Sequence, residues 1–409
     1  MAYTAVKGGS DAIVAAEKLI QQPQIAPGEA EIALEQIAHQ MPAAVDKVMS
    51  EGGLYAPGLA AMAIRQVEGD LFEAAFMLRA YRSTLPRFGY SLPTRGDEMR
   101  VVRRISSSFR DIPGGQLLGR TRDYTQRLLN VGEFGAFENS AVGALNGNGT
   151  ANGAAREQLP NGSHDANAGN GAAPGLPTHF PKVADVMRAM GIMASRPSDN
   201  GHAGEIPVTE PDDITRESMR FPVSRTAWLQ ALARGESGAL VCLAYSSMRG
   251  YGGKGDHGTI AELRVGDLPL TVTHPLTGQP VTIGHYRATE VEMTGREHRR
   301  RSSEAKLDRY GLSYGLVFGQ HERKAIAMAL LDSTLMEQAP IEGQAAPAND
   351  QEMVLYHLDG IESFGFVEHL KLPHFVTFGS GLQLMMEQAT SASAAAMNEP
   401  VAQDGTATA

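Results

Sequence analysis

Features that form disulfides or span membranes are almost missing from this sequence. Its 409 residues include a single cysteine, Cys242, so no internal disulfide can form. Cys242 lies in the apolar run GALVCLAY at residues 238–245, where we expect a buried, inert thiol. The run is far shorter than the roughly 20 residues of a membrane-spanning helix, and the opening MAYTAVKGGS lacks the apolar core of a signal peptide. We therefore expect a cytoplasmic globular protein.

Motifs of several enzyme classes are also absent. The sequence has no Gly-x-Ser-x-Gly elbow, no Gly-x-x-x-x-Gly-Lys-Ser/Thr loop and no Gly-x-Gly-x-x-Gly after an early strand. These absences argue against a serine hydrolase, a P-loop enzyme and a Rossmann dehydrogenase. A cysteine in an apolar segment is also a poor source of thiolate, which argues against a cysteine nucleophile.

Positive charge is scarce overall but is concentrated in one place. The formal net charge is -10, which argues against a general nucleic-acid binder. Between residues 87 and 127, however, nine arginines accompany four acidic residues, a local net charge of +5. The arginines are Arg87, Arg95, Arg100, Arg103, Arg104, Arg110, Arg120, Arg122 and Arg127, and the acids are Asp97, Glu98, Asp111 and Asp123. This basic island indicates a bound anion; the alternative is a solvated face or a subunit interface rich in ion pairs.

The first 135 residues are predicted to be mainly helical. Apolar residues recur at helical spacing between residues 29 and 49, and Asp70 followed by Glu73 is typical of a helix start, with the helix running to about Leu85. On that helix Arg79 and Arg82 are three residues apart and share a face. Both are candidates to join the basic island in binding a substrate.

Low-complexity segments divide the chain. Residues 140–204 begin with an Asn/Gly/Ala-rich insert that has too little apolar surface to order itself, and residues 340–350 and 391–409 are similar in character. We expect these parts to be mobile. The predicted regions are then a helical one at 1–139 with the basic island, an α+β one at 205–339, and a C-terminal segment at 351–390.

The second half alternates between helix and strand patterns. A helix is predicted at residues 226–234 and another at 321–336, with strands at 239–246, in LPLTVTHPL and RATEVEMTG, and in YGLVFG before Gln320. The fold class is therefore α+β, with a helical N-terminal half followed by a mixed sheet-and-helix C-terminal half.

The densest candidate anion site lies in SSFRDIPGGQLLGRTRDYTQRLL, residues 107–129. Gly114 and Gly115 can bring backbone N–H groups close to an anion, and Arg104 and Arg110 can supply positive charge. Together with a helix start near Thr121, these groups suit a polyphosphate, although a Pro-Gly-Gly sequence is also an ordinary turn.

Other candidate residues lie in loops. Arg249 follows the apolar run at 238–245 among glycines and serines, and Arg323 lies where a helix opens after YGLVFG. Three carboxylates have positions that suit catalysis, namely Asp111, Asp212 and Glu322, although Asp212 is equally a turn residue and Glu322 suits the start of a helix.

Two histidines, His369 and His374, flank Leu-Lys-Leu-Pro in GFVEHLKLPHFVTFGS at residues 365–380. A spacing of five places side chains on different faces of a helix or a strand. Pro373, however, biases Leu372 toward an extended conformation, so a bend can fall between the imidazoles. The pair is either a partial metal site, open to water, substrate or another chain, or one core and one surface histidine.

A series of segments, in order from residue 3 to about residue 385, closely resembles the PhnI family of bacterial carbon-phosphorus lyase systems. The segments are AVKGG, EGG, FMLRAYRSTL, RRISSSFRDIPGGQLLG, DYTQRLL, EPDDITR, LAYSSMRGYG, YGLVFG, ERKAIAMALLD and GFVEHLKLPHFVTF. The insert at about residues 140–175 departs from this resemblance, and we expect it to have no catalytic role.

The resemblance implies a subunit that works with PhnG, PhnH, PhnJ and PhnL to make α-D-ribose 1-methylphosphonate 5-triphosphate from ATP and methylphosphonate, displacing adenine. It also implies a purine nucleosidase activity of the single subunit on ATP or GTP, with Mg as a further ion and two copies in a hetero-oligomeric core. The H-x-x-x-x-H pair of this family is associated with a metal near PhnJ, which assigns His369 and His374 to zinc. The alternative is a scaffold subunit whose partners carry the catalytic groups.

Overall fold

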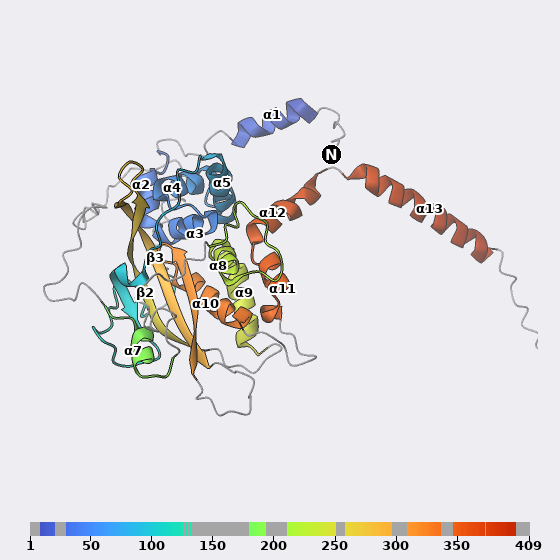
Figure 1. Ribbon diagram of the computed structural model, residues 1–409. Helices are drawn as coiled ribbons and strands as arrows, with labels where there is room; N and C mark the ends of the chain where they lie inside the picture. The colour runs from blue at the N-terminus through green and yellow to red at the C-terminus, as the bar shows by residue number, and fades with distance from the viewer. Residues whose placement is uncertain are drawn as a thin grey trace, which may run out of the picture. The chain divides into compact units, whose positions relative to one another are not determined.

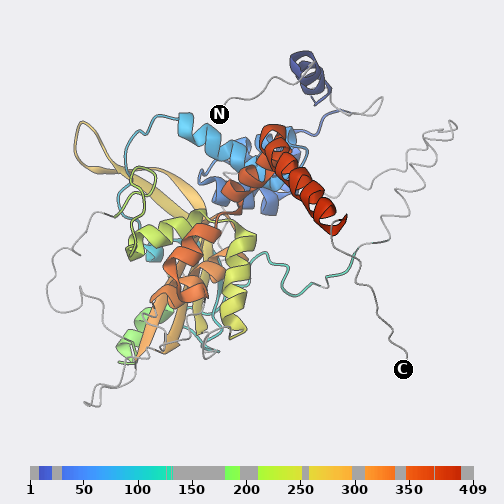
Figure 2. The same cartoon turned by 90° about the vertical axis from the view of Figure 1, so that its right-hand side faces the viewer.

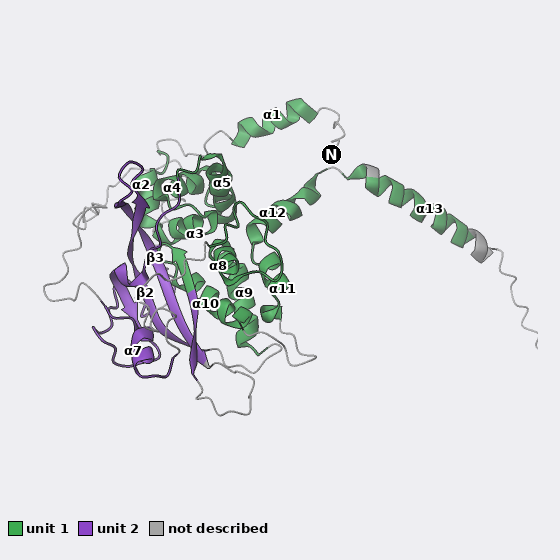
Figure 3. Ribbon diagram, in the orientation of Figure 1, with its two compact units in different colours: residues 1–88, 207–257, 315–409 green, residues 89–206, 258–314 purple. Residues whose placement is uncertain are grey.

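The structure is a computed structural model that describes residues 9–20, 30–125, 127–129, 131, 180–193, 211–250, 258–296, 309–336, 347–372 and 374–397. It confirms the α+β fold class, with helices and one four-stranded sheet among these residues. The residues form two compact units (Figure 3): unit 1 comprises 1–88, 207–257 and 315–409, and unit 2 comprises 89–206 and 258–314. The insert predicted at residues 140–175 lies outside the described residues.

The elements follow one another along the chain as labelled in Figure 1. The helices of unit 1 are α1 (Gly9–Ile20), α2 (Leu34–Gln40), α3 (Pro42–Gly52), α4 (Pro57–Gln66), α5 (Leu71–Thr84), α8 (Arg225–Arg234), α9 (Ser237–Met248), α10 (Glu322–Met336), α11 (Gln351–His357), α12 (Gly360–Glu368) and α13 (Phe375–Met397). Unit 2 holds β1 (Arg100–Ile105), α7 (Val183–Ala189), β2 (Thr259–Thr273) and β3 (Pro280–Arg296), and the boundary between the units falls within β4 (Tyr310–Phe318). Short 3-10 turns are η1 (Gly96–Glu98), η3 (Pro347–Asn349) and η4 (His369–Lys371).

Helices α2 to α5 pack around one apolar core in unit 1. Val48 and Met49 of α3, Ile64 of α4 and Leu78 of α5 are buried in it. The helix predicted between residues 29 and 49 is in fact two helices, because Pro42 has no N–H to continue α2 and begins α3 instead. The N-cap prediction for α5 is confirmed, since the Asp70 carboxylate accepts hydrogen bonds from the first turn of the helix.

Helix α10 contacts both α8 and α9 within unit 1 (Figures 1 and 2). The prediction of a strand at residues 239–246 is wrong, because this run belongs to α9. A short apolar run does not by itself distinguish a strand from a helix, and here the Glu236 carboxylate caps the helix by accepting from the backbone of Gly238 and Ala239, both at 2.7 Å. The expectation of a buried thiol is also wrong, since Cys242 lies on the exposed side of α9.

The C-terminal part of the chain is helical for longer than its composition predicts. Helix α13 continues to Met397, past residue 390, where we expected a mobile tail to follow. Part of the predicted linker at 340–350 likewise forms η3. None of the helices in the described ranges combines the length and the apolar character needed to cross a bilayer.

The sheet has the strand order β1-β2-β3-β4, and the register shows how its faces are used. Arg104 of β1 lies opposite Arg264 of β2, which lies opposite Glu290 of β3, so these side chains share one face. Leu263 and Val291 point to the other face and are fully buried. Strand β1 was not predicted, because the first 135 residues were expected to be mainly helical and the arginines of RVVRRI were assigned to the basic island.

Candidate functional site

The two histidines at the end of α12 face each other. The ring centroids of His369 and His374 are 5.1 Å apart and the ring planes meet at 88°. The chain turns between them because His369 starts the 3-10 turn η4, after which Leu372 is extended at φ -74° and ψ 155°. The predicted extended Leu372 is confirmed, while Pro373 itself lies outside the described residues. The bend therefore brings together two imidazoles that regular structure would separate.

Hydrogen bonding fixes which nitrogen of His374 is available. Its Nδ1 lies 2.6 Å from the carbonyl oxygen of Leu372, and a carbonyl can only accept, so Nδ1 carries the proton. The lone pair of Nε2 is then left for a metal ion, a tautomer that is common for histidine ligands. His374 is exposed and His369 is half-buried. Within the described residues no group of three or more His, Cys, Asp or Glu side chains could hold a metal ion, so a metal ion bound to these two imidazoles would need further ligands from outside this set.

Arg104 has a structural role instead of the predicted contact with an anion. It is fully buried, and its guanidinium donates to the Glu262 carboxylate and to the carbonyl oxygens of Pro113, Gly115 and Pro181, the last three at 2.7–2.9 Å. The turn at Gly114 and Gly115 thus directs the carbonyl groups of Pro113 and Gly115 toward Arg104, and the N–H of Gly115 donates to the carbonyl oxygen of Ile112. This corrects the expectation of a phosphate-binding loop at this turn.

Much of the basic island is neutralised within the protein. Arg95 pairs with Asp97 at 2.8 Å, Arg100 with Asp267 at 2.9 Å, and Arg103 is buried with a 2.5 Å contact to Asp123. Arg110 and Asp111 are exposed in the loop after β1. The island therefore agrees better with the ion-paired alternative than with one continuous anion-binding surface.

The other predicted residues are dispersed through unit 1. Asp212 accepts hydrogen bonds from the hydroxyls of Ser224, the N-cap of α8, and Thr226, and these bonds lower the pKa of its exposed carboxyl, which does not favour a role as a catalytic acid. Arg249 ends α9 with its guanidinium 5.9 Å from the Tyr245 ring centroid.

Glu322 and Arg323 lie in the first turn of α10. Glu322 accepts a 3.3 Å hydrogen bond from the side chain of Gln320, and Arg323 is exposed. On α5, Arg79 donates to Asp359 at 2.8 Å and to the backbone oxygens of Glu51 and Arg234, the last two at 2.8 and 3.0 Å. Arg82 lies one turn further along α5, in its last turn.

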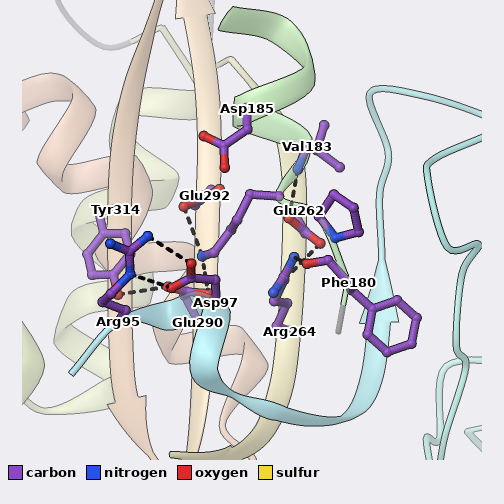
Figure 4. A network of polar contacts seen from close by, with 12 residues as sticks. Arg95, Asp97, Phe180, Val183, Asp185, Glu262, Arg264, Glu290, Glu292 and Tyr314 are labelled. Atoms are coloured by element: carbon purple, nitrogen blue, oxygen red, sulfur yellow. Dashed lines mark hydrogen bonds and ion pairs between the residues drawn. The ribbon is translucent and has the colours of Figure 1, made fainter. Parts of the chain in front are cut away.

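A buried charged layer lies on the sheet face that Arg104 shares (Figure 4). The Lys182 ammonium contacts Glu290 at 2.5 Å and Glu292 at 3.0 Å. Burial disfavours its charge, but Glu292 and Glu290 outweigh that effect and raise the pKa of Lys182. Burial also raises the pKa of Glu292, and Tyr314 donates to Glu290 at 3.0 Å.

The same layer binds the segment at residues 180–183 in unit 2. Arg264 donates to the carbonyl oxygen of Phe180 at 2.9 Å, and the N–H of Val183 donates to Glu262 at 3.0 Å (Figure 4). Most of its charged groups pair with one another, although Arg264 Nη1 and Glu292 Oε2 have no hydrogen-bond partner among the described residues, and the ion pairs make the layer a structural element of unit 2.

A second buried polar network joins α3, α9 and α10 in unit 1. The Ser237 hydroxyl donates to Glu51 and accepts from His321 Nε2 at 2.9 Å. Burial, reinforced by Lys324, lowers the pKa of His321 to about 3, so the ring is neutral near pH 7. Lys324 is fully buried, and its ammonium donates to the Ser50 hydroxyl at 2.8 Å. Sequence reasoning missed this network, because His321 and Lys324 look like the polar side chains of an exposed first turn.

Comparison with known proteins gives the family. A family model described as "Bacterial phosphonate metabolism protein (PhnI)" matches residues 2–392. The chain belongs to the PhnI family. The resemblance found in the sequence segments is thereby confirmed.

Relatives of this PhnI family member carry related names. The α-D-ribose 1-methylphosphonate 5-triphosphate synthase subunit PhnI of Escherichia coli is 41% identical over 386 residues, which cover 94% of this chain and 97% of that protein. The subunit with the same name in Rhizobium meliloti is 39% identical, with 94% of each chain covered. A protein named putative C-P lyase subunit protein HtxH in Stutzerimonas stutzeri is 40% identical over 93% of this chain and 94% of its own length.

Proposed function

We propose that this chain is a subunit of a carbon-phosphorus lyase system for phosphonate catabolism and takes part in making α-D-ribose 1-methylphosphonate 5-triphosphate from ATP and methylphosphonate. The observation that carries the proposal is the identity of 41% over nearly the whole length of a subunit with that synthase name. The partners we propose are PhnG, PhnH, PhnJ and PhnL, in a core with two copies of this chain.

The proposed reaction exchanges the group on C1′ of the ribose. A phosphonate oxygen of methylphosphonate forms a bond to C1′, the bond from C1′ to N9 of adenine breaks, and the base leaves with a proton. Positive charge develops at C1′ and negative charge on the base, so the reaction needs a nearby carboxylate and an acid. We keep Asp111 and Glu322 as candidates for these roles, since both are at least partly accessible, whereas the Asp212 carboxylate is bonded to the hydroxyls of Ser224 and Thr226.

The histidine pair supports a metal site in the same system. We propose that His369 and His374 hold zinc, with the remaining ligands from water, substrate or a partner subunit, and that Mg accompanies the ATP. Bound zinc would act as a Lewis acid on an oxygen ligand. The contribution of this chain is to hold two imidazoles in one orientation, through η4 and the hydrogen bond from His374 to Leu372.

Zinc content tests the metal assignment. We expect His369→Ala and His374→Ala each to lose zinc from the purified complex while the circular dichroism spectrum and melting temperature stay within error of the wild type, because both side chains lie at the surface. His357→Ala is the matched control, since His357 is exposed and bonded to its own helix. Unchanged zinc content in either variant of the pair contradicts the assignment.

A scaffold role is the second candidate function, and the C-terminal helix favours it. Phe378, Leu384 and Met385 of α13 are 69%, 60% and 70% exposed, and apolar surface of this kind commonly contacts another subunit. On this reading the catalytic groups belong to partners, and we would expect no turnover by the single chain.

Adenine release separates the two functions. The purified chain is incubated with ATP alone, and then with the four partners and methylphosphonate, and free adenine and the phosphorus-containing product are followed. We propose that the chain alone releases adenine from ATP or guanine from GTP, and that the complete set forms the ribose methylphosphonate. Release only with partners supports the scaffold, and no product in the complete set contradicts the proposed synthase function.

A further inference from the structure

Four arginines gather in unit 1 near the ends of α5 and α8. Arg79 and Arg82 belong to α5, Arg87 follows it, and Arg234 is the last residue of α8. Three of them have carboxylate partners: Arg79 contacts Asp359 at 2.8 Å, Arg87 contacts Asp213 at 2.5 Å, and Arg234 contacts Glu362 at 2.6 Å. Each of these three charges is thereby balanced by a carboxylate of the same unit.

Arg82 differs from the other three. Its half-buried guanidinium forms no hydrogen bond or ion pair with the residues that the structure describes. It lies beside the end of α3, where its Nη1 is 3.4 Å from the point that a Cβ on Gly53 would occupy. The cluster thus holds a guanidinium that is partly removed from water and has no acceptor among the described residues.

The surroundings of Arg82 are electropositive. Burial, Arg234, Arg87 and Arg79 all lower the pKa of Arg82, and Asp213 only partly opposes them. Arg234 contributes positive charge beside Arg82, although its Nε is buried and its Nη2 is held by Glu362. A guanidinium without an acceptor among the described residues, in a region of excess positive charge, is the arrangement that an oxyanion satisfies, since the planar fork of arginine matches the oxygens of a phosphate.

We propose that Arg82 binds a phosphate group of a polyphosphate substrate, at a site bordered by Gly53, Arg79, Arg87 and Arg234. Arg79 acts as a positioning residue, because its bonds to Asp359 and to the carbonyl oxygen of Arg234 hold α5 and α8 together. The choice of a polyphosphate rests on the proposed function, in which ATP is the substrate. We propose this location instead of the turn at Gly114 and Gly115, because the Arg104 guanidinium there is already bonded to Glu262 and to backbone carbonyl oxygens.

A purely structural explanation of Arg82 makes a different prediction. Arg82 lies in the last turn of α5, where a positive side chain is favoured by the helix dipole. If that were its only role, replacing the guanidinium would alter stability slightly and leave anion binding unchanged.

Binding of inorganic tripolyphosphate to the full-length protein distinguishes the two. We expect Arg82→Gln to weaken binding in isothermal titration calorimetry roughly 10- to 100-fold, the usual effect of losing a charge-assisted hydrogen bond. Arg82→Lys keeps the charge but loses the fork, so its loss should be smaller, and it should retain more of the salt dependence. Arg65→Gln is the control, because it removes the same charge from an exposed position on α4. Equal affinity of Arg82→Gln and the wild type overturns the proposal.

Chemical modification tests the site without any variant. Phenylglyoxal modifies accessible arginines, and mass spectrometry of the wild-type protein gives the modification rate of Arg82. We expect tripolyphosphate to slow the reaction at Arg82 at least several-fold while Arg65 reacts at an unchanged rate. No protection of Arg82 overturns the site, even where both Arg82 variants fold poorly.

The adenine assay keeps this inference separate from the proposed function. If the complete system turns over ATP but tripolyphosphate does not protect Arg82 from modification, the proposed function is supported and the proposed binding site is refuted. If tripolyphosphate protects Arg82 but the complete system forms no product, the binding site is supported and the proposed function is refuted.

Discussion

The buried Lys324 should make the stability of unit 1 increase with pH, and Lys324→Met should abolish much of that increase. Lys324 is fully inaccessible, and its Nζ donates a 2.8 Å hydrogen bond to the Ser50 hydroxyl. Burial is the main cause that lowers the pKa of Lys324 to about 7; Glu51 opposes this effect and Lys47 reinforces it. Methionine has a similar length and carries no charge, so it fits the same space.

The direction of the effect follows from proton binding in the two states. The ordinary pKa of lysine is about 10.4, so between about pH 7 and pH 10 the unfolded chain holds a proton that the folded protein has released. The free energy of unfolding therefore rises with pH across this window. For a pKa lowered to about 7, the gain between pH 7 and pH 9 is about 2 kcal/mol, because each pKa unit corresponds to about 1.4 kcal/mol.

The single tryptophan provides the assay. Trp228 is buried in α8 of unit 1, where its indole N–H donates to Asp332 at 2.8 Å, so its fluorescence reports unfolding of that unit. Urea titrations at pH 7, 8 and 9 should show the wild type gaining about 2 kcal/mol more than Lys324→Met. Lys18→Met serves as the control, since Lys18 is exposed on α1 and its loss should leave the pH dependence unchanged. Parallel pH dependence in the wild type and Lys324→Met would refute the reasoning.

Two further substitutions test unit 2. Gly96→Ala would press a methyl group against the Glu290 carboxylate and should lower the free energy of unfolding by about 1–3 kcal/mol, whereas Gly89→Ala has open space; equal melting temperatures for the two would contradict the packing described here. Glu262→Gln leaves two buried arginines short of a counter-charge and should lower the stability by about 3–5 kcal/mol in denaturant unfolding. A loss below about 1 kcal/mol, the range of surface ion pairs, would show that the layer does not depend on this carboxylate.

Local signals predicted several elements correctly. The cap at Asp70 and the helix pattern after Gln320 are encoded within a few residues, and the structure has helices at both places. The bend between His369 and His374 could also be predicted from the sequence, because the effect of a proline on the preceding residue is local.

The errors concern features decided by residues far apart in the sequence. The apolar pattern of residues 238–245 is compatible with a strand or a helix. The helix is favoured by the cap at Glu236 and by the packing of α9 against α10. Arg104 looked like an exposed cation because its counter-charge, Glu262, lies 158 residues away. The network of His321 and Lys324 was hidden for the same reason, since its acceptors come from α3 and α9.

The anchoring of residues 180–183 on the sheet has a consequence for how such a chain can change. Arg104, Arg264 and Glu262 bind the backbone of this segment, and Lys182 adds a buried ion pair, so the strands set the position of the segment on the sheet. These donors and acceptors all lie in β1, β2, β3 or the segment itself. A change of length confined to residues 132–179 leaves every one of them in place, so we expect an affinity tag inserted in that range to leave this anchoring intact.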